Sequence, residues 1–247
     1  MSPDTLPPSE PDDRAARGTP VGRRVFLGLV GLGVAGIATG AALQGWLERT
    51  LGPIVGRDPS GVLALLPLGR FRLYTVTGDF PVRSRADYRL RVDGLVDTPL
   101  DLSFAELTDM PRVDITRDFQ CVTGWRVPEV AWAGVRLRDV LDAAGTDARA
   151  KAVRFVSFDG AYSESLTLAQ ARRDDVLVAY ELEGEPLSSD HGGPARLYVA
   201  PMYGYKSCKW LSRIELTEAV EPGYWEQRGY DVDGWVGRSN GRDDEAV

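Results

Sequence analysis

Cys121 is one of only two cysteines in the 247-residue chain, and its surroundings suit chemistry. It follows a predicted strand and precedes the turn-prone pair Thr123 and Gly124. A thiol at the point where a strand opens into a loop can direct its sulfur into a pocket, where the thiolate is a soft metal ligand or a nucleophile. Free cysteines are also among the most buried residue types. The residues around Cys121 therefore do not decide whether it is a metal ligand or a packed core residue.

A second stretch, residues 191–210, gathers groups that bind anions. The only histidine, His191, stands on a Gly-Gly-Pro turn, and Arg196 follows at the start of a predicted strand. Lys206, Ser207 and Lys209 then supply two cations and a hydroxyl. A planar guanidinium together with lysine and serine is suited to holding a phosphate. The alternative is a solvated loop with an aromatic flank.

Composition excludes several classes of function. The net charge of −7 and the pI near 4.9 argue against general nucleic-acid binding. One histidine and two cysteines exclude a multi-histidine metal site and a zinc cluster, which needs four ligands. Cys121 and Cys208 remain able to form one disulfide in an oxidising compartment.

The N-terminal part predicts export or membrane anchoring. Residues 1–22 are polar and should be disordered, and residues 23–47 begin with Arg23 and Arg24 followed by 23 uncharged residues. As a helix that run would be about 35 Å long, enough to cross a bilayer. The paired arginines before an apolar Gly/Ala-rich run resemble a twin-arginine export signal, which carries folded proteins. We expect an uncleaved anchor, a linker over residues 48–70, and the domain on the extracytoplasmic face of the membrane.

Hydrophobic periodicity predicts a mixed, strand-rich α+β domain over residues 71–230. Short helices are expected after Ser103, where Glu106 completes a capping box, and from residue 135 to Gly145 and from 167 to 172. The polar residues 231–247 are expected to fray. Strands are expected at residues 72–76, 88–94, 112–119, 152–158, 176–181, 196–200 and 209–216.

Three separated motifs resemble the sulfite oxidase type of molybdopterin-dependent oxidoreductase. They are Phe-Gln-Cys at residues 119–121, His-Gly-Gly-Pro-Ala-Arg at 191–196, and Tyr-Gly-Tyr-Lys-Ser-Cys-Lys-Trp-Leu at 203–211. The motifs stand in the family's order, and the resemblance covers about residues 70–230. It implies a molybdenum–molybdopterin cofactor, whose insertion before export fits a signal for folded proteins.

The resemblance assigns roles residue by residue. Cys121 matches the cysteine whose thiolate binds molybdenum, and a soft anionic sulfur suits that metal. Arg83 resembles an arginine that attracts anionic substrate, and Tyr230 resembles a tyrosine near the metal that handles substrate or protons. For Cys208 the alternative is a buried core residue. The predicted cofactor-binding residues are Asp159, His191, Arg196, Lys206, Ser207, Cys208 and Lys209.

The resemblance implies oxygen-atom transfer on a small, sulfite-like or sulfoxide-like substrate. After Cys121 the run 122–126 departs from the Ala-Gly-Asn and basic residues of animal and plant enzymes, so the substrate stays open. The sequence holds no CxxCH haem motif and no iron–sulfur cysteine set, so electrons must pass through a separate partner, such as a membrane haem protein or a cytochrome. The alternatives are a non-catalytic binding module on the same fold and a metal-free domain with a Cys121–Cys208 disulfide.

Overall fold

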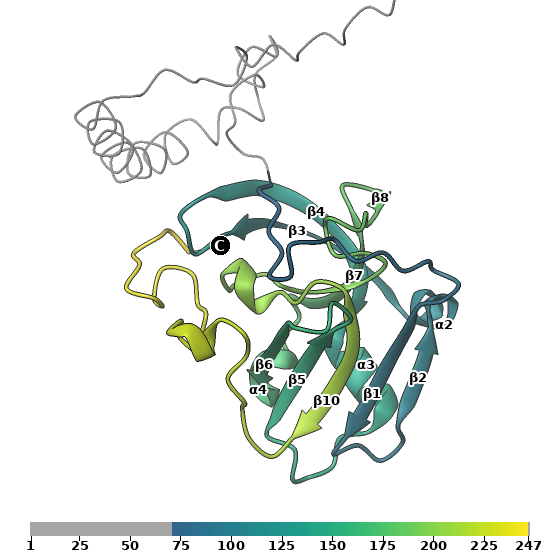
Figure 1. Ribbon diagram of the computed structural model, residues 1–247. Helices are drawn as coiled ribbons and strands as arrows, with labels where there is room; N and C mark the ends of the chain where they lie inside the picture. The colour runs from purple at the N-terminus through teal and green to yellow at the C-terminus, as the bar shows by residue number, and fades with distance from the viewer. Residues whose placement is uncertain (1–70, 247) are drawn as a thin grey trace, which may run out of the picture. The chain divides into compact units, whose positions relative to one another are not determined.

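The computed structural model describes residues 71–246, which form two five-stranded sheets and short helices (Figure 1). The first sheet has the order β2-β1-β10-β5-β6, and only β1 and β10 are parallel. Its strands are β1 (Arg89–Gly94), β2 (Leu100–Ser103), β5 (Ala152–Ser157), β6 (Ser163–Thr167) and β10 (Leu211–Thr217). Because β10 comes late in the chain and pairs between β1 and β5, it ties both halves of the domain together.

The second sheet has the order β3-β4-β7-β8, and β9 pairs with β7 off this path. All of its pairs are antiparallel. Its strands are β3 (Arg112–Gln120), β4 (Arg126–Arg136), β7 (Val176–Leu182), β8 (Glu185–Pro186) and β9 (Arg196–Val199). The helices are α2 (Phe104–Asp109), α3 (Leu137–Ala144) and α4 (Leu168–Ala171), with the 3-10 turns η3 (Gly204–Lys206) and η4 (Glu226–Arg228).

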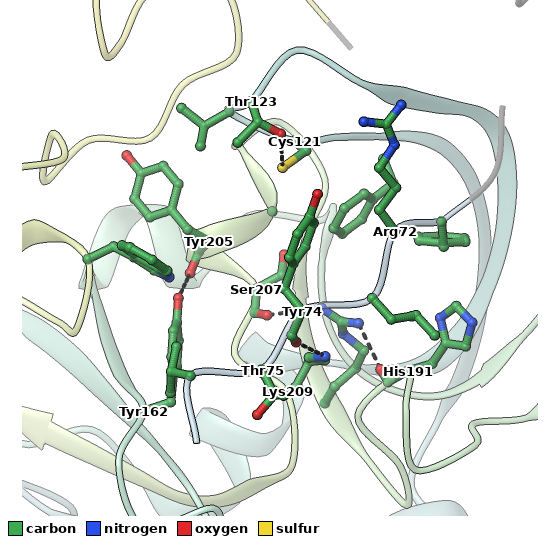
Figure 2. Close-up of a pocket in the computed structure, with 18 of the residues that line it drawn as sticks. Arg72, Tyr74, Thr75, Cys121, Thr123, Tyr162, His191, Tyr205, Ser207 and Lys209 are labelled. Carbon is green, nitrogen blue, oxygen red and sulfur yellow. Dashed lines mark hydrogen bonds between the residues drawn. The ribbon is translucent and has the colours of Figure 1, made fainter. Parts of the chain in front are cut away.

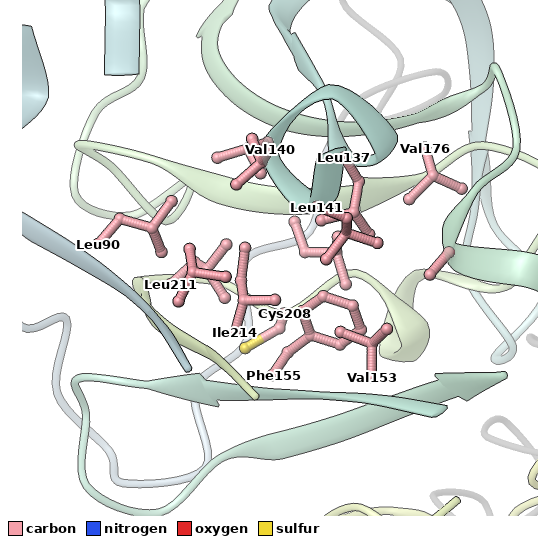
Figure 3. Packing of buried hydrophobic residues seen from close by; sticks show 14 of the residues in the cluster. Leu90, Leu137, Val140, Leu141, Val153, Phe155, Val176, Cys208, Leu211 and Ile214 are labelled. Carbon is pink, nitrogen blue, oxygen red and sulfur yellow. The ribbon is translucent and has the colours of Figure 1, made fainter. Parts of the chain in front are cut away.

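The main core lies where α3 packs between strands of both sheets (Figure 3). Leu137, Val140 and Leu141 of α3 are fully buried against Leu90 of β1 and Phe155 of β5. Their spacing puts the apolar side chains on one face of the helix, which is why this short segment is stable only as part of the core.

The side chains of strand β7 point alternately into two hydrophobic clusters. Val176 and Val178 face the main core, whereas Leu177 and Ala179 face a second cluster that is rich in aromatic residues. In that cluster Trp132 stacks on Tyr198 with ring centroids 4.2 Å apart. Both faces of β7 are therefore buried, and the aromatic cluster supports the strand ends that carry Cys121 and Arg196.

Most of the predicted elements are confirmed, including the α+β class and the capping box in which Ser103 and Glu106 bond to each other's backbone. The strand expected at residues 72–76 is wrong: this arm (residues 71–76) pairs with no strand in the described part of the chain. Strands β2, β4, β6 and β8 were not predicted from the sequence. The helix expected from residue 135 begins at Leu137, because Val135 and Arg136 still pair with β7.

The expectation of a frayed C-terminus is also wrong. Met202 and Trp235 form a β-bridge, Val236 is buried, and the hydroxyl of Tyr203 bonds to Asp244. Residues 231–246 are polar in composition but dock through these few contacts. Within residues 71–246 no helix is long and apolar enough to cross a membrane. The predicted tail, signal or anchor, and linker of residues 1–70 lie outside the described residues.

Candidate functional site

A cavity of about 360 Å³ brings together segments that are distant in the sequence (Figure 2). Its lining comes from the arm, from the loop after β3, from the β5–β6 loop, from the turn before β9, from the η3 region, and from residues 225 and 230. Of the ten predicted site residues, the cavity lining includes seven: Cys121, Asp159, His191, Arg196, Ser207, Lys209 and Tyr230.

Cys121 sits on a tight turn after β3. Its backbone N–H donates to the carbonyl of Trp125 at 2.9 Å, and Gly124 N–H donates to the carbonyl of Cys121 at 3.0 Å. Gly124 has a φ of +98°, which a residue with a side chain rarely adopts. Burial raises the pKa of the Cys121 thiol, and hydrogen bonds from Thr123 act in the opposite sense. The sulfur lies 3.2 Å from the hydroxyl oxygen of Thr123.

Arg196 and Lys209 make another part of the cavity electropositive. The Arg196 guanidinium is buried and donates to the carbonyls of His191 at 2.8 Å and Ser207 at 3.0 Å. The Lys209 ammonium donates to the carbonyls of Tyr74 at 2.5 Å and Asp190 at 3.2 Å. Within residues 71–246 neither cation forms an ion pair with a carboxylate. Burial lowers the pKa of Arg196 to about 10, and burial followed by the charge of Arg196 lowers that of Lys209 to about 7. Two cations held this way favour an anionic ligand.

Three further side chains present polar atoms to the same cavity. Asp159 uses Oδ1 to accept from the N–H groups of Ala161 and Tyr162, and its buried Oδ2 has no partner in the described part of the chain. Nδ1 of His191 is likewise buried and unpaired there, and burial lowers the pKa of this imidazole. Ser207 Oγ accepts from the N–H of Val199 at 3.0 Å, which leaves its own proton to donate. Unpaired buried polar groups at a cavity indicate where a polar ligand is needed.

Tyr230 belongs to an aromatic wall of the cavity. Its ring stacks on Trp225 with centroids 5.1 Å apart and meets the edge of Tyr205 at 5.3 Å. Trp225 and Tyr230 belong to the C-terminal segment (residues 223–244) and Tyr205 belongs to η3, so the docking of that segment on η3 decides the shape of this side of the cavity.

The structure does not bring Lys206, Cys208 or Arg83 to the cavity lining, which corrects three predicted placements. Lys206 is buried with its ammonium between Glu164 and Glu226, so it has no free donor for a cofactor phosphate. Cys208 packs in the main core, as the alternative expected. The guanidinium of Arg83 lies 4.0 Å from the centre of the Phe158 ring, which holds it by a cation–π contact.

Both cysteines are free thiols, which contradicts the alternative of a Cys121–Cys208 disulfide. Cys121 lines the cavity, whereas the side chain of Cys208 is fully buried among core residues. The two sulfurs belong to different packing environments, and this removes the ground for the metal-free alternative.

The arm is a part of the site that was not predicted from the sequence. Arg72, Tyr74 and Thr75 line the cavity, and the Tyr74 carbonyl accepts from Lys209. The segment alternates polar and apolar residues as a strand does, so its pattern gave no signal for this role. Tyr162 was also missed; it donates to the carbonyl of Tyr205 at 2.5 Å and links the β5–β6 loop to η3.

No group of three or more His, Cys, Asp or Glu side chains that could hold a metal occurs among residues 71–246. Cys121 is the cysteine on the cavity, so a metal there would draw its other ligands mainly from a non-protein group.

Residues 77–225 match the model of the oxidoreductase molybdopterin-binding domain. The chain belongs to this family. It is 38% identical over 159 residues to the uncharacterized oxidoreductase YuiH of Bacillus subtilis, with 64% of this chain and 80% of that protein covered. It is 30% identical over 203 residues to the putative protein-methionine-sulfoxide reductase subunit YedZ1 of Azospira oryzae, with 80% of this chain and 72% of that protein covered.

The fold agrees with a solved relative. The sulfane dehydrogenase SoxCD of Paracoccus pantotrophus aligns with a TM-score of 0.53 and 25% identity, covering 61% of this chain and 45% of that chain. The chain also covers 45% of the sulfite oxidase of Arabidopsis thaliana, to which it is 32% identical. It is therefore a sulfite oxidase-family molybdopterin oxidoreductase of strand-rich α+β fold, and it spans about half the length of the two larger relatives.

The family implies a molybdenum cofactor, and the residues on the cavity fit one. Cys121 offers the single soft sulfur that a metal with other, non-protein ligands needs. Arg196 and Lys209 offer charge for a phosphate. The unpaired Oδ2 of Asp159 and Nδ1 of His191 offer hydrogen bonds to a polar heterocycle.

Proposed function

We propose that this chain is an exported, membrane-anchored molybdenum–molybdopterin oxidoreductase that moves an oxygen atom to or from a small substrate. The observation that carries the proposal is that the Cys121 sulfur shares one cavity with Arg196 and Lys209, two cations that lack carboxylate partners in the described part of the chain. A soft sulfur suits the metal and the cations suit the phosphate, so one bound group would satisfy all three residues.

The protein residues would divide the work of holding this group. Cys121 would bind the metal, Arg196, Ser207 and Lys209 would hold the phosphate, and Asp159 and His191 would orient the pterin. The bound cofactor would supply the two-electron redox chemistry.

The aromatic residues of the cavity would act on the substrate side. Trp125, Trp225 and Tyr230 would exclude water from the metal side of the cavity, and the Tyr230 hydroxyl would donate a hydrogen bond to the substrate.

The overall reaction requires a redox partner that accepts or supplies two electrons. Oxidation of a sulfite-like substrate takes an oxygen atom from water and releases two electrons and two protons, and reduction of a sulfoxide-like substrate consumes two of each. The chain has no haem or iron–sulfur motif, so a membrane haem protein or a cytochrome would carry the electrons. The Azospira relative is named as a subunit, which supports a two-component system.

Export is proposed from residues 14–47 alone. Arg23 and Arg24 before 23 uncharged residues support twin-arginine export with an uncleaved anchor and the domain on the extracytoplasmic face. A fusion to a reporter active only after export tests this. Replacing both arginines with lysine should abolish the reporter signal, and an unchanged signal would contradict twin-arginine export.

The cofactor proposal is tested by metal content. The full chain, expressed in cells that make molybdopterin, should contain one molybdenum per chain by mass spectrometry and release a fluorescent pterin on oxidation. Cys121→Ser should lose the metal, whereas Cys208→Ala should keep it because that sulfur lies in the core. Folded wild-type protein without molybdenum or pterin would sink the proposal.

The substrate is then tested with artificial electron carriers. Sulfite oxidation is measured with an acceptor dye, and reduction of methionine sulfoxide and smaller sulfoxides with a donor dye. Sulfite oxidation or sulfoxide reduction by the wild type, with no activity in Cys121→Ser, would support an oxygen-atom transferase. A metal-loaded protein inert to the whole panel would favour a binding module on the same fold.

A further inference from the structure

We propose that Thr123 tunes the reduction potential of a metal bound at Cys121, by donating a hydrogen bond from its hydroxyl to the Cys121 sulfur. The proposal rests on the proposed function above, and it assigns a role to a residue that neither the motifs nor the charges of the site identify. Thr123 is a positioning residue in this role, since it acts through the sulfur rather than on the substrate.

The geometry of the turn supports this contact. The hydroxyl oxygen of Thr123 lies 3.2 Å from the Cys121 sulfur, within hydrogen-bond range, and Figure 2 shows the two atoms facing each other. The bond from Gly124 N–H to the Cys121 carbonyl and the bond from Cys121 N–H to the Trp125 carbonyl close the turn around Thr123. Trp125 is buried, so it fixes the far end of the turn. The backbone of the turn thus holds Thr123 beside the sulfur, and the side-chain rotamer of Thr123 brings its hydroxyl within reach.

The direction of the hydrogen bond follows from the chemistry of a metal-bound sulfur. A thiolate ligand has no proton and can only accept, so the threonine hydroxyl must be the donor. Within residues 71–246 this hydroxyl has no other partner that would compete for its proton. Nothing in the described structure therefore opposes the donor role.

The effect on the metal follows from charge. A hydrogen bond to the sulfur withdraws electron density from the sulfur–metal bond. It stabilises the reduced, more electron-rich metal more than the oxidised one, and so raises the reduction potential. The positive charges of Arg72 and Arg242 also act on Cys121, but they are unaffected by a change of the Thr123 side chain.

The test compares two substitutions in the cofactor-loaded full chain. Thr123→Val keeps the shape and removes the donor, and Thr123→Ser keeps the donor. Thr123 is exposed and outside every helix and strand, so both variants should fold. Redox titration, followed by electron paramagnetic resonance of the one-electron-reduced metal, measures the potential. Thr108→Val is the matched control, since Thr108 is a half-buried threonine on α2 that does not line the cavity.

We expect Thr123→Val to lower the ratio of reduced to oxidised metal at the wild-type midpoint roughly tenfold, which is about 59 mV for a one-electron couple. Thr123→Ser and Thr108→Val should match the wild type. A potential unchanged in Thr123→Val, or lowered equally in Thr123→Ser, would overturn the inference while leaving the proposed function standing. Wild-type protein that loads no molybdenum would overturn both, and the metal analysis done first tells the two failures apart.

Discussion

The ammonium of Lys206 lies 2.5 Å from the Glu226 carboxylate, and this contact joins the C-terminal segment to the turn η3 beneath the cavity. The same ammonium bonds to Glu164 at 2.5 Å and to the carbonyl of Val232 at 2.8 Å. Lys206 is almost completely buried, and the residues that it ties down flank Trp225 and Tyr230. A lysine predicted to bind the cofactor instead holds one wall of its cavity in place.

Lys206→Met should therefore destabilise the protein strongly. Removing one partner of a buried ion pair leaves an uncompensated charge and costs about 3–5 kcal/mol. Urea denaturation of the full chain measures the free energy of unfolding. Lys151→Met, at an exposed lysine, is the matched control and should change little. A loss in Lys206→Met no larger than in the control would show that Lys206 does not anchor the segment.

The two thiols should differ sharply in reactivity. Cys121 lines the cavity and Cys208 is fully buried, so cofactor-free native protein should react with a small alkylating reagent at Cys121 only. Both should react after unfolding without a reducing agent, because neither is in a disulfide. Peptide mass spectrometry identifies the labelled residue. Unfolded protein that resists labelling until it is reduced would restore the disulfide alternative.

Stability of the cofactor-free protein should rise with pH between about 7 and 8.5. Burial lowers the pKa of Lys209 to about 7, below its value in the unfolded chain, so in this window the unfolded state binds more protons than the folded state. The slope from this one group is at most about 1.4 kcal/mol per pH unit. Thermal or urea unfolding across the window measures it.

Lys209→Met should flatten that slope, and Lys151→Met should leave it unchanged. Below the window Lys209 is charged in both states, so its contribution no longer varies with pH. If the wild type and Lys209→Met show parallel stability profiles, Lys209 does not titrate near neutrality in the folded protein.

Gly192→Ala should disturb the side of the cavity that carries Lys209. Gly192 has a φ of +98°, and an added Cβ would come within 2.7 Å of the Cβ of Lys209. Backbone strain alone costs roughly 1–3 kcal/mol, and the clash adds a shift of the lysine. Gly184→Ala has a similar φ of +77° with nothing within 4 Å, so it isolates the strain.

The measurement for this pair is unfolding free energy together with retained molybdopterin. Gly184→Ala should lose stability but keep the cofactor, whereas Gly192→Ala should lose more stability and also lose cofactor. Equal cofactor content in the two variants would mean that the position of Lys209 does not matter for binding.

The sequence by itself determined the chemistry of the site, because side-chain type decides what an atom can bind. The soft sulfur of Cys121 and the cations Arg196 and Lys209 could be identified without coordinates, and the structure puts all three on one cavity. Local features were equally readable: the capping box of Ser103 and Glu106 depends only on residues three apart.

Tertiary structure decided which neighbours in the sequence face the cavity. In the run 206–209, Lys206 and Cys208 are buried away from the cavity while Ser207 and Lys209 line it, and this orientation depends on η3 packing against the C-terminal segment. The roles of the arm and of residues 231–246 were hidden for the same reason. The arm bonds to Lys209, which is 135 residues further along the chain, and residues 231–246 bond to Tyr203 and Lys206, which are 41 and 26 residues away from their partners. No local sequence pattern encodes contacts over such separations.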